Sequence, residues 1–331
     1  MIITNKKSIA VVTGGYSGED IISFLSSNVV IKHIPSDKYE VTKVIINRKR
    51  WLFEKNGIKG EVDKNDFTIT IDGEKSGFDC VFVALHGTPA EDGKLPAYFD
   101  MIGIPYTCCK PSVSTMTFNK GYTVSLLNKY GVLTAESIIL KKTDTVDLDE
   151  IINNVGLPCF VKPNEGGSSI GISKVNLKED LAPSIEKAFQ EDETVLIEKF
   201  LDGTEITCGV TKIHGKIQAL GVTEIVTQND FFDFDAKYND QKTQEITPAR
   251  ISNVMIEKCK KDSEYIFKTL GCSGIIRIDY ILCKDKLYVL EINTIPGLSD
   301  KSIVPKMAQY IGLSLEELFT EQIINAIAFS R

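Results

Sequence analysis

The chain has 331 residues, and its 38 lysines and arginines stand against 45 aspartates and glutamates, so the formal net charge is −7. At roughly 150 residues per domain, this length predicts two or three domains. With 43% hydrophobic and 25% charged residues, the composition excludes a disordered or low-complexity chain. The acidic balance argues against nucleic acid or an anionic membrane as the main partner.

Membrane insertion and secretion are not indicated. No apolar run approaches the roughly 18 residues that a membrane span needs, and the opening MIITNKKSIAVVTGG runs into a strand pattern without a signal-peptide cleavage region. None of the eight cysteines forms a CxxC pair, and only three histidines accompany them. We therefore expect a soluble cytoplasmic protein with buried, reduced thiols rather than a zinc site.

The first third of the chain has a doubly wound α/β pattern. Apolar runs predict buried strands, and a helix is expected from about Glu19 to Val30. In such sheets ligands bind beyond the carboxyl ends of the strands, which predicts that Glu19 and His86 lie near one crevice. A polar excursion around Trp51 interrupts the pattern. The expected strands are 8–13, 41–46 and 79–85, and the excursion is 47–77.

The remainder predicts a mixed helix and strand organisation. The irregular segment 227–247 has the length of a functional loop or lid. Ser252 and Gly271 fit the start and end of one helix, and Ser314–Glu317 fits a capping box. The expected helices are 114–130, 147–154, 177–190 (broken or begun afresh at Pro183), 252–270, 302–311 and 315–329. The expected strands are 136–140, 159–162, 171–175, 194–198, 205–212, 216–224, 275–282 and 286–293.

The strands IIRIDYIL and KLYVLEIN are the most informative segments. Because strand side chains alternate, Arg277 and Asp279 share one face, as do Glu291 and Asn293. A three-residue turn at 284–286 would set Asp279 opposite Glu291, where like charges repel. The oxygen ligands of Asp279, Glu291 and Asn293 suit Mg²⁺, which would explain two carboxylates on an apolar hairpin.

The other face of this hairpin is expected to be apolar, with Leu290 and Ile292 beside Ile276, Ile278 and Tyr280. An alternative to the metal site is a structural network in which Arg277 neutralises Asp279 or Glu291. We favour the metal because four polar groups share the face and the segment Thr294–Gly297 follows at once.

Other candidates are weaker when taken alone. The loop Asn164–Gly171 has the composition of a phosphate-binding loop but equally that of a flexible surface loop. Lys162 precedes it on a buried strand and needs an anion. Lys237 and Tyr238, in the lid-like segment, are either ligand contacts or solvated loop residues, and Glu19 by itself fits a helix terminus.

Seven segments together resemble one family. They are GGYSGE (14–19), ALHGTPAEDG (84–93), FVKPNEGGSSIGISKV (160–175), VLIEKFLDGTE (195–205), DFDAKY (233–238), RIDY (277–280) and EINTIPGLSDKSIVP (291–305). In this order, spanning about residues 9–320, they resemble the D-alanine–D-alanine ligases of the ATP-grasp superfamily.

The resemblance implies an α/β (α+β) ATP-grasp fold. Its parts would be an N-terminal doubly wound domain (1–108), a central subdomain (109–198) and a C-terminal subdomain (199–331). It also implies ATP-driven synthesis of D-alanyl-D-alanine for peptidoglycan precursors, through an acyl phosphate. The implied partners are two D-alanine molecules and, for the protein itself, a second copy in a homodimer.

The resemblance assigns roles to particular residues. Arg277 and the backbone of Gly297 would stabilise the oxyanion. Glu19 would bind the first D-alanine's ammonium and connect to Ser168 and Tyr238, with His86 near the same substrate. Ser302 and Lys237 would meet the second D-alanine's carboxylate or the transferred phosphate. Asp279, Glu291 and Asn293 would ligate Mg²⁺ or Mn²⁺, as two ions. The nucleotide would contact Lys120, Lys162, Gly167, Ser169, Glu198, Lys199, Leu201, Glu205 and Lys237, with the loop Gly166–Ser169 folded over its phosphates.

The sequence departs from the family pattern at three places. Asp20 stands where the family often has arginine, Lys301 where it usually has histidine, and the loop reads NEGG instead of a motif with Arg-Glu or Ser-Glu. None of these changes removes a metal ligand. Tyr238 favours the dipeptide over the D-alanyl-D-lactate variants.

Two rival hypotheses stay open beside the ligase. One is an ATP-grasp carboxylate–amine ligase with a different acid, which Glu19 and residues 231–238 would discriminate. The other is a non-enzymatic nucleotide-binding regulator, against which Arg277 and Glu291 weigh. A dehydrogenase is excluded because the first glycine loop lacks GxGxxG.

Overall fold

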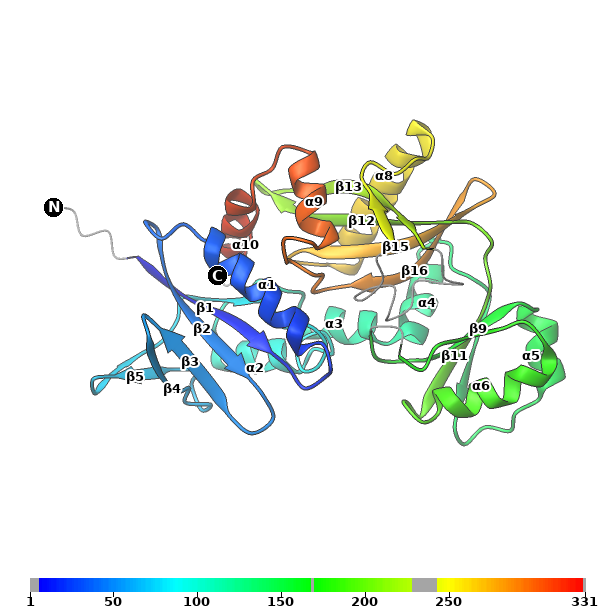
Figure 1. Ribbon diagram of the computed structural model, residues 1–331, viewed down its shortest axis with the longest axis horizontal. Coiled ribbons are helices and arrows are strands. Elements are labelled where there is room, and N and C mark those ends of the chain that lie inside the picture. The colour runs from blue at the N-terminus through cyan, green and yellow to red at the C-terminus, as the bar shows by residue number, and fades with distance from the viewer. Residues whose placement is uncertain (1–5, 168–169, 228–242, 330–331) are drawn as a thin grey trace.

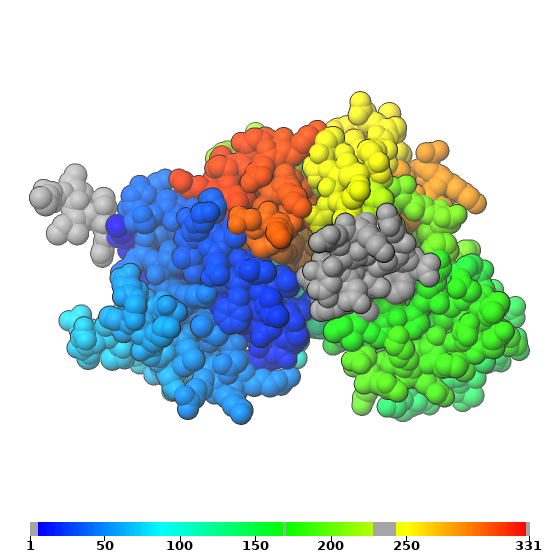
Figure 2. Space-filling model, in the orientation of Figure 1, coloured from blue at the N-terminus to red at the C-terminus, as the bar shows by residue number. Residues whose placement is uncertain are grey.

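The computed structural model describes residues 6–167, 170–227 and 243–329. Ser168, Ser169, Lys237 and Tyr238, which carry predicted roles, therefore lie outside the described residues, as does the rest of 231–238. Figure 1 shows the first unit in blue and cyan, the middle unit in green, and the last in yellow to red. In the space-filling view of Figure 2, the blue and green units lie at opposite ends and the last unit lies between them along one side.

The first unit is built on a mixed sheet, in which the three strands predicted from the sequence pair in parallel and two further strands add to one edge in antiparallel pairing. Strand β1 (Lys7–Gly14) lies between β2 (Tyr39–Ile46) and β7 (Cys80–Val83), in the order β4-β3-β2-β1-β7. Ile9 and Val11 of β1 pack with α1 (Asp20–His33) and α10 (Leu315–Phe329). The alternate residues Ala10 and Val12 pack with α2 (Lys94–Ile102), so both faces of the sheet are covered.

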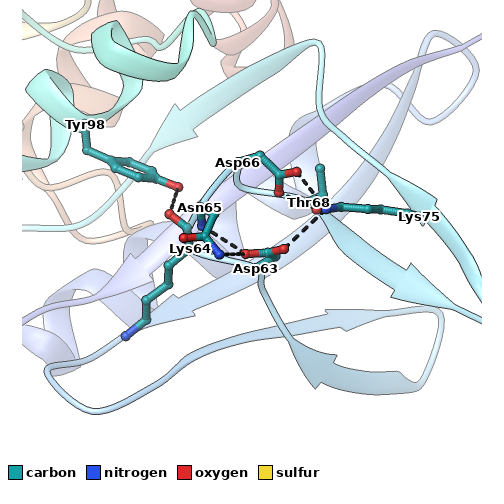
Figure 3. Close-up of polar contacts among 7 residues, drawn as sticks. All are labelled: Asp63, Lys64, Asn65, Asp66, Thr68, Lys75 and Tyr98. Carbon is teal, nitrogen blue, oxygen red and sulfur yellow. Dashed lines mark hydrogen bonds and ion pairs between the residues drawn. The ribbon is translucent and has the colours of Figure 1, made fainter.

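The polar excursion forms short hairpins: β3 (Trp51–Lys55) with β4 (Ile58–Glu61), and β5 (Ile69–Ile71) with β6 (Glu74–Ser76). Trp51 packs edge-on against Tyr98 of α2, with ring centroids 5.1 Å apart. Figure 3 shows the polar contacts here: Lys75 pairs with Asp63 and with an Asp66 oxygen 2.7 Å away, and the Tyr98 hydroxyl donates to the Lys64 carbonyl. The excursion is therefore fastened to the first unit by aromatic and polar contacts.

The middle unit is an antiparallel sheet in the order β10-β9-β11-β8. Two helices, α5 (Leu148–Val155) and α6 (Leu181–Ala188), contribute to its core. A 3₁₀ turn (Lys178–Asp180) precedes α6, and Pro183 lies in the first turn of α6, where a missing N–H is tolerated. The strands are β8 (Ser137–Lys141), β9 (Cys159–Pro163), β10 (Ser173–Val175) and β11 (Thr194–Lys199).

The expectation of one helix over 114–130 is wrong, because two helices cover this range: α3 (Pro111–Phe118) and α4 (Lys120–Lys129). Asn119 adopts an extended backbone between them, and its side chain accepts a hydrogen bond from the Tyr122 N–H. Asn119 therefore ends α3 and caps the N-terminus of α4.

The last unit is an antiparallel sheet in the order β14-β13-β12-β15-β16. The predicted helix starts are confirmed, since Ser252 accepts from the Met255 N–H and Ser314 accepts from the Glu317 N–H. The strands are β12 (Thr204–Ile213), β13 (Lys216–Val226), β14 (Gln244–Ile246), β15 (Ile276–Cys283) and β16 (Lys286–Asn293). The helices are α8 (Asn253–Leu270), α9 (Ile303–Tyr310) and the α10 already described.

The turn between β15 and β16 differs from the expectation. It has two residues, Lys284 and Asp285, both with positive φ, and Cys283 pairs with Lys286. One extra residue, Leu290, is accommodated by a bulge where Asp279 gives way to Tyr280. The shorter turn and the bulge compensate, so the expected opposition of Asp279 and Glu291 is confirmed.

The bulge also corrects the expectation for Leu290. The alternation of the strand predicts this side chain on the apolar face with Ile292, but it lines a cavity on the opposite face, whereas Ile292 stays in the core. The predicted domain limits 1–108, 109–198 and 199–331 stay a prediction. The last of these ranges also supplies α10, whose Phe319 packs edge-on against Phe82 of the first sheet.

None of the helices in the described part of the chain combines the length and the hydrophobicity that crossing a membrane would require.

Two glycines between α8 and β15 test how this strand is positioned. A Cβ at Gly274 (φ 72°) would lie 2.1 Å from the Thr107 carbonyl oxygen, whereas one at Gly271 (φ 69°) would meet nothing within 4 Å. Gly271→Ala should lower the free energy of unfolding by about 1 kcal/mol, from left-handed strain alone. Gly274→Ala adds a backbone clash and should lower it by about 3 kcal/mol. Urea denaturation checks this, and equal losses would contradict it.

Candidate functional site

Two cavities meet at the face of the β15–β16 hairpin. One, of about 420 Å³, lies between the middle and last sheets and is lined by Lys162, Glu198 and Asp279, among others. The other, of about 390 Å³, is lined by Glu19 of the first unit and by residues of the last. Arg277 and Glu291 line both cavities. Ligands held in the two cavities would therefore approach each other at these side chains.

The hairpin face carries a dense polar network. Arg277 donates from Nε to Asp279 Oδ1 (2.8 Å) and from Nη2 to Oδ2 (2.7 Å). Thr207 also donates to Asp279 Oδ1, at 2.5 Å. The Asn293 amide nitrogen donates to Asp279 Oδ2 at 3.0 Å and to Glu291 Oε1 at 3.4 Å. Donors on both sides thus hold the two opposed carboxylates in place.

These residues fit a hard cation. Asp279 and Glu291 face each other across the strand pair, and Asn293 stands between their oxygens. The orientation of the Asn293 amide is set by its hydrogen-bond partners. If the amide turned by 180°, its oxygen instead of its nitrogen would point between the two carboxylates, where it could bind a cation. In residues 6–167, 170–227 and 243–329, no group of three or more His, Cys, Asp or Glu is arranged to hold a metal. The candidate donor set is therefore two carboxylates and one amide.

The nucleotide-side candidates separate into two groups. Lys162 of β9 and Glu198 of β11 form a buried ion pair, with Nζ 2.5 Å from Oε1, and both line the larger cavity. The anion that Lys162 needs is thus Glu198. Lys199 also lines this cavity, but its ammonium pairs with Glu136 at 2.8 Å. Leu201 and Glu205 line the same cavity.

The glycine loop approaches the smaller cavity. Lys120 donates from Nζ to the Gly166 carbonyl at 2.9 Å, and both residues line this cavity and not the larger one. A Cβ at Gly167 would lie 2.9 Å from Glu19 Oε1, so the loop backbone lies against that carboxylate. The loop is anchored by Asn164, whose side chain accepts from Gly121 N–H.

The smaller cavity brings together the predicted substrate residues. Glu19, His86, Gly297 and Ser302 all line it, which confirms the crevice expected for Glu19 and His86. Ser302 Oγ is 2.8 Å from Ser299 Oγ, and a Cβ at Gly297 would lie 2.7 Å from Ser302 Oγ. Only glycine fits at 297 without displacing Ser302.

Sequence reasoning missed Glu91. It lines the smaller cavity, where burial, with the neighbouring Glu19 charge, raises its pKa well above the ordinary 4.5. Its place in ALHGTPAEDG, five residues after His86, was the available signal. A protonated carboxyl there limits the negative charge of a cavity that already contains Glu19 and Glu291.

Glu91→Gln should become increasingly stabilising as the pH rises. A carboxyl with a raised pKa keeps, in the folded state, a proton that the unfolded chain has already lost above pH 4.5. The wild-type protein therefore loses stability above that pH, by at most about 1.4 kcal/mol per pH unit for one proton, until the folded-state pKa is passed. Glutamine does not titrate, so the difference in free energy of unfolding, measured by urea denaturation between pH 4 and 8, should widen in favour of the variant.

The control for this experiment is Glu257→Gln. The ion pair with Lys260 lowers the pKa of Glu257, so that substitution should become less favourable as the pH rises from acid. If the difference in free energy of unfolding between Glu91→Gln and the wild-type protein stayed constant or narrowed as the pH rose, the raised pKa of Glu91 would be contradicted.

Comparisons with known proteins agree over nearly the whole chain. Family models described as D-ala D-ala ligase N-terminus and C-terminus match residues 8–109 and 126–325. The D-alanine–D-alanine ligase of Flavobacterium johnsoniae is 46% identical over 323 residues, which cover 97% of this chain and 100% of that relative.

Solved structures are similar over the same extent. The VanG D-Ala:D-Ser ligase of Enterococcus faecalis superposes with a TM-score of 0.87 at 30% identity, covering 98% of this chain and 100% of that one. The D-alanyl-alanine synthetase A of Vibrio cholerae gives 0.88 at 26% identity, covering 98% and 99%. The chain has the ATP-grasp fold, and it belongs to the D-alanine–D-alanine ligase family.

Proposed function

We propose that this protein performs the reaction of its family and joins two D-alanine molecules into D-alanyl-D-alanine, a peptidoglycan precursor, while ATP is converted to ADP and phosphate. Family membership over nearly the whole chain supports this function. The structural observation that carries it is the pair Arg277 and Glu291, which line both cavities. A nucleotide in the larger cavity and amino acids in the smaller would meet there.

The reaction has two steps. A carboxylate oxygen of the first D-alanine attacks the γ-phosphorus of ATP, and the bond to the bridging oxygen of ADP breaks, which gives an acyl phosphate. The deprotonated amine of the second D-alanine then attacks the carbonyl carbon, and phosphate leaves with one of the amine protons as the peptide bond forms. Charge develops on the carbonyl oxygen in this second step, where oriented donors are most effective.

The hairpin residues take the central roles in this proposal. Arg277 and the Gly297 N–H donate to the developing oxyanion. Glu19 receives the first D-alanine's ammonium. Ser302 receives the carboxylate of the second. Arg277 suits its role because its guanidinium is already held by Asp279 and so needs little ordering.

The phosphates require cations. ATP and a divalent metal accompany the family's activity, and we propose Mg²⁺, replaceable by Mn²⁺, as two ions held by Asp279, Glu291 and Asn293. Such ions supply charge neutralisation to the phosphates. Lys162, Glu198, Leu201 and Glu205 are proposed to bind the nucleotide, with Lys120, Gly167 and the backbone of Lys199 at its margins. The contacts of Ser168, Ser169, Lys237 and Tyr238, outside the described residues, stay predictions from the family resemblance.

ATP as a substrate and seven buried, unpaired cysteines suit the cytoplasm. A homodimer is the assembly that we expect, and sedimentation at several protein concentrations measures it.

The function is tested by phosphate release with ATP, Mg²⁺ and single amino acids. D-Alanine should support turnover, and the product should be identified as the dipeptide by mass spectrometry. L-Alanine should not. D-Serine and D-lactate test the choice of second substrate. Equal rates with D- and L-alanine would contradict the proposal.

Glu291→Gln should reduce ATP turnover at least about 100-fold, because it removes one of two opposed charges that would hold the cation. The fold should persist, since an amide can still accept from Asn293. Asp285→Asn, an exposed change at the tip of the same hairpin, is the matched control and should retain wild-type rates. Near-normal turnover by Glu291→Gln, with circular dichroism unchanged, would refute its role as a metal ligand.

A further inference from the structure

Two buried serines of α1 meet the same histidine. Ser23 and Ser26 are three residues apart, on one face of the helix, and neither is exposed to solvent. Ser23 Oγ donates to the Glu19 carbonyl at 3.2 Å and accepts from the His86 N–H at 2.9 Å. Ser26 Oγ lies 2.9 Å from His86 Nε2 and accepts from the Leu298 N–H at 3.1 Å.

The partners of His86 determine its tautomer. Its Nδ1 lies 2.7 Å from the Ile295 carbonyl oxygen, which can only accept, so Nδ1 carries the proton and Nε2 is the acceptor. The single hydroxyl proton of Ser26 therefore goes to Nε2, and its lone pair receives the Leu298 N–H. Burial lowers the pKa of His86 despite the nearby Glu19 charge, which keeps the ring neutral.

Both ring nitrogens of His86 are thus occupied by protein partners. The ring lines the substrate cavity but has no nitrogen left to offer to an amino acid. A direct hydrogen bond from the ring to a substrate therefore does not explain why position 86 is a histidine. What the ring does instead is join α1 to residues 295–298, which are more than 200 positions away in the chain.

The network holds the segment on both sides of Gly297. On one side the Ile295 carbonyl is bonded to His86, and on the other the Leu298 N–H is bonded to Ser26. The same helix begins directly after Glu19, and Ser23 bonds the Glu19 carbonyl. The ammonium site and the oxyanion site therefore share one set of buried hydrogen bonds.

We infer that Ser26 is a positioning residue for the ligation, which acts through His86 and Leu298 to fix the Gly297 backbone in register with Glu19. The inference rests on the proposed function, since it gives Gly297 and Glu19 their tasks. Loss of the Ser26 hydroxyl leaves both Nε2 and the Leu298 N–H without a partner. Small displacements of an oxyanion donor have large effects on rate, because its contribution depends on geometry in the transition state.

Ser26→Ala and Ser27→Ala form the matched pair that tests this. Ser27 is equally buried, but its hydroxyl donates to the Phe24 carbonyl of its own helix. Ser26→Ala should lower kcat about tenfold, the factor that corresponds to one hydrogen bond of ordinary strength, with the KM for ATP unchanged. Ser27→Ala should keep the wild-type kcat. Melting temperatures of both variants separate this effect from general destabilisation.

Rescue and spectroscopy complete the test. Ser26→Cys keeps a weak donor of similar size and should recover part of the lost kcat, even if the alanine variant folds poorly. Nitrogen-15 spectra are tractable because the chain has only three histidines. His86 should carry its proton on Nδ1 in the wild-type protein, and its Nε2 resonance should shift in the variants at position 26.

Two results would overturn the inference. One is a kcat for Ser26→Ala equal to that of Ser27→Ala, and the other is a wild-type His86 with its proton on Nε2. If the wild-type protein failed to ligate D-alanine, the proposed function would fail, whereas the tautomer would still decide whether the network exists.

Discussion

The opposition of Asp279 and Glu291 across the β15–β16 pair is the constraint on which the site depends. Two carboxylates this close repel each other in the absence of cations. The protein balances them with the guanidinium of Arg277 and the amide of Asn293, on the same hairpin face. The two cavities meet at this face, so the groups that hold the carboxylates also lie where two substrates would react.

The alternative to a metal site, a network in which Arg277 neutralises Asp279, is present in the structure. Arg277 grips Asp279 with two hydrogen bonds, which by itself would explain the acid. Glu291 and the Asn293 amide extend the arrangement beyond what a single ion pair needs. The two interpretations are therefore compatible, because Glu291 lies opposite Asp279 and the Asn293 amide contacts both carboxylates.

Local patterns made much of the fold predictable. Alternation in IIRIDYIL assigned Arg277 and Asp279 to one face, and Ser252 and Ser314 marked helix starts through hydrogen bonds within one turn. The register of the hairpin was predicted from a turn of the wrong length. The outcome was right only because the bulge at Leu290 offset the missing turn residue, and sequence alone carries no signal for that compensation.

The misses have a common physical origin. The Glu198 partner of Lys162 lies 36 residues away, and the Ile295 partner of His86 lies 209 away, so neither is visible in local periodicity. Glu91 acquires its raised pKa only when the cavity closes around it. An asparagine such as Asn119 can lie inside a helix or cap one, and local sequence does not decide between the two. In the structure Asn119 is a cap, because its side chain accepts a hydrogen bond from the Tyr122 N–H.

The most direct test of the account is a crystal structure grown with Mn²⁺ and a non-hydrolysable ATP analogue. We expect an anomalous difference peak between Asp279 and Glu291, with carboxylate oxygens at about 2.1 Å and phosphate oxygens of the nucleotide completing the coordination. A nucleotide bound in the larger cavity with no ion between the two acids, and with Asp279 held by Arg277 alone, would contradict it.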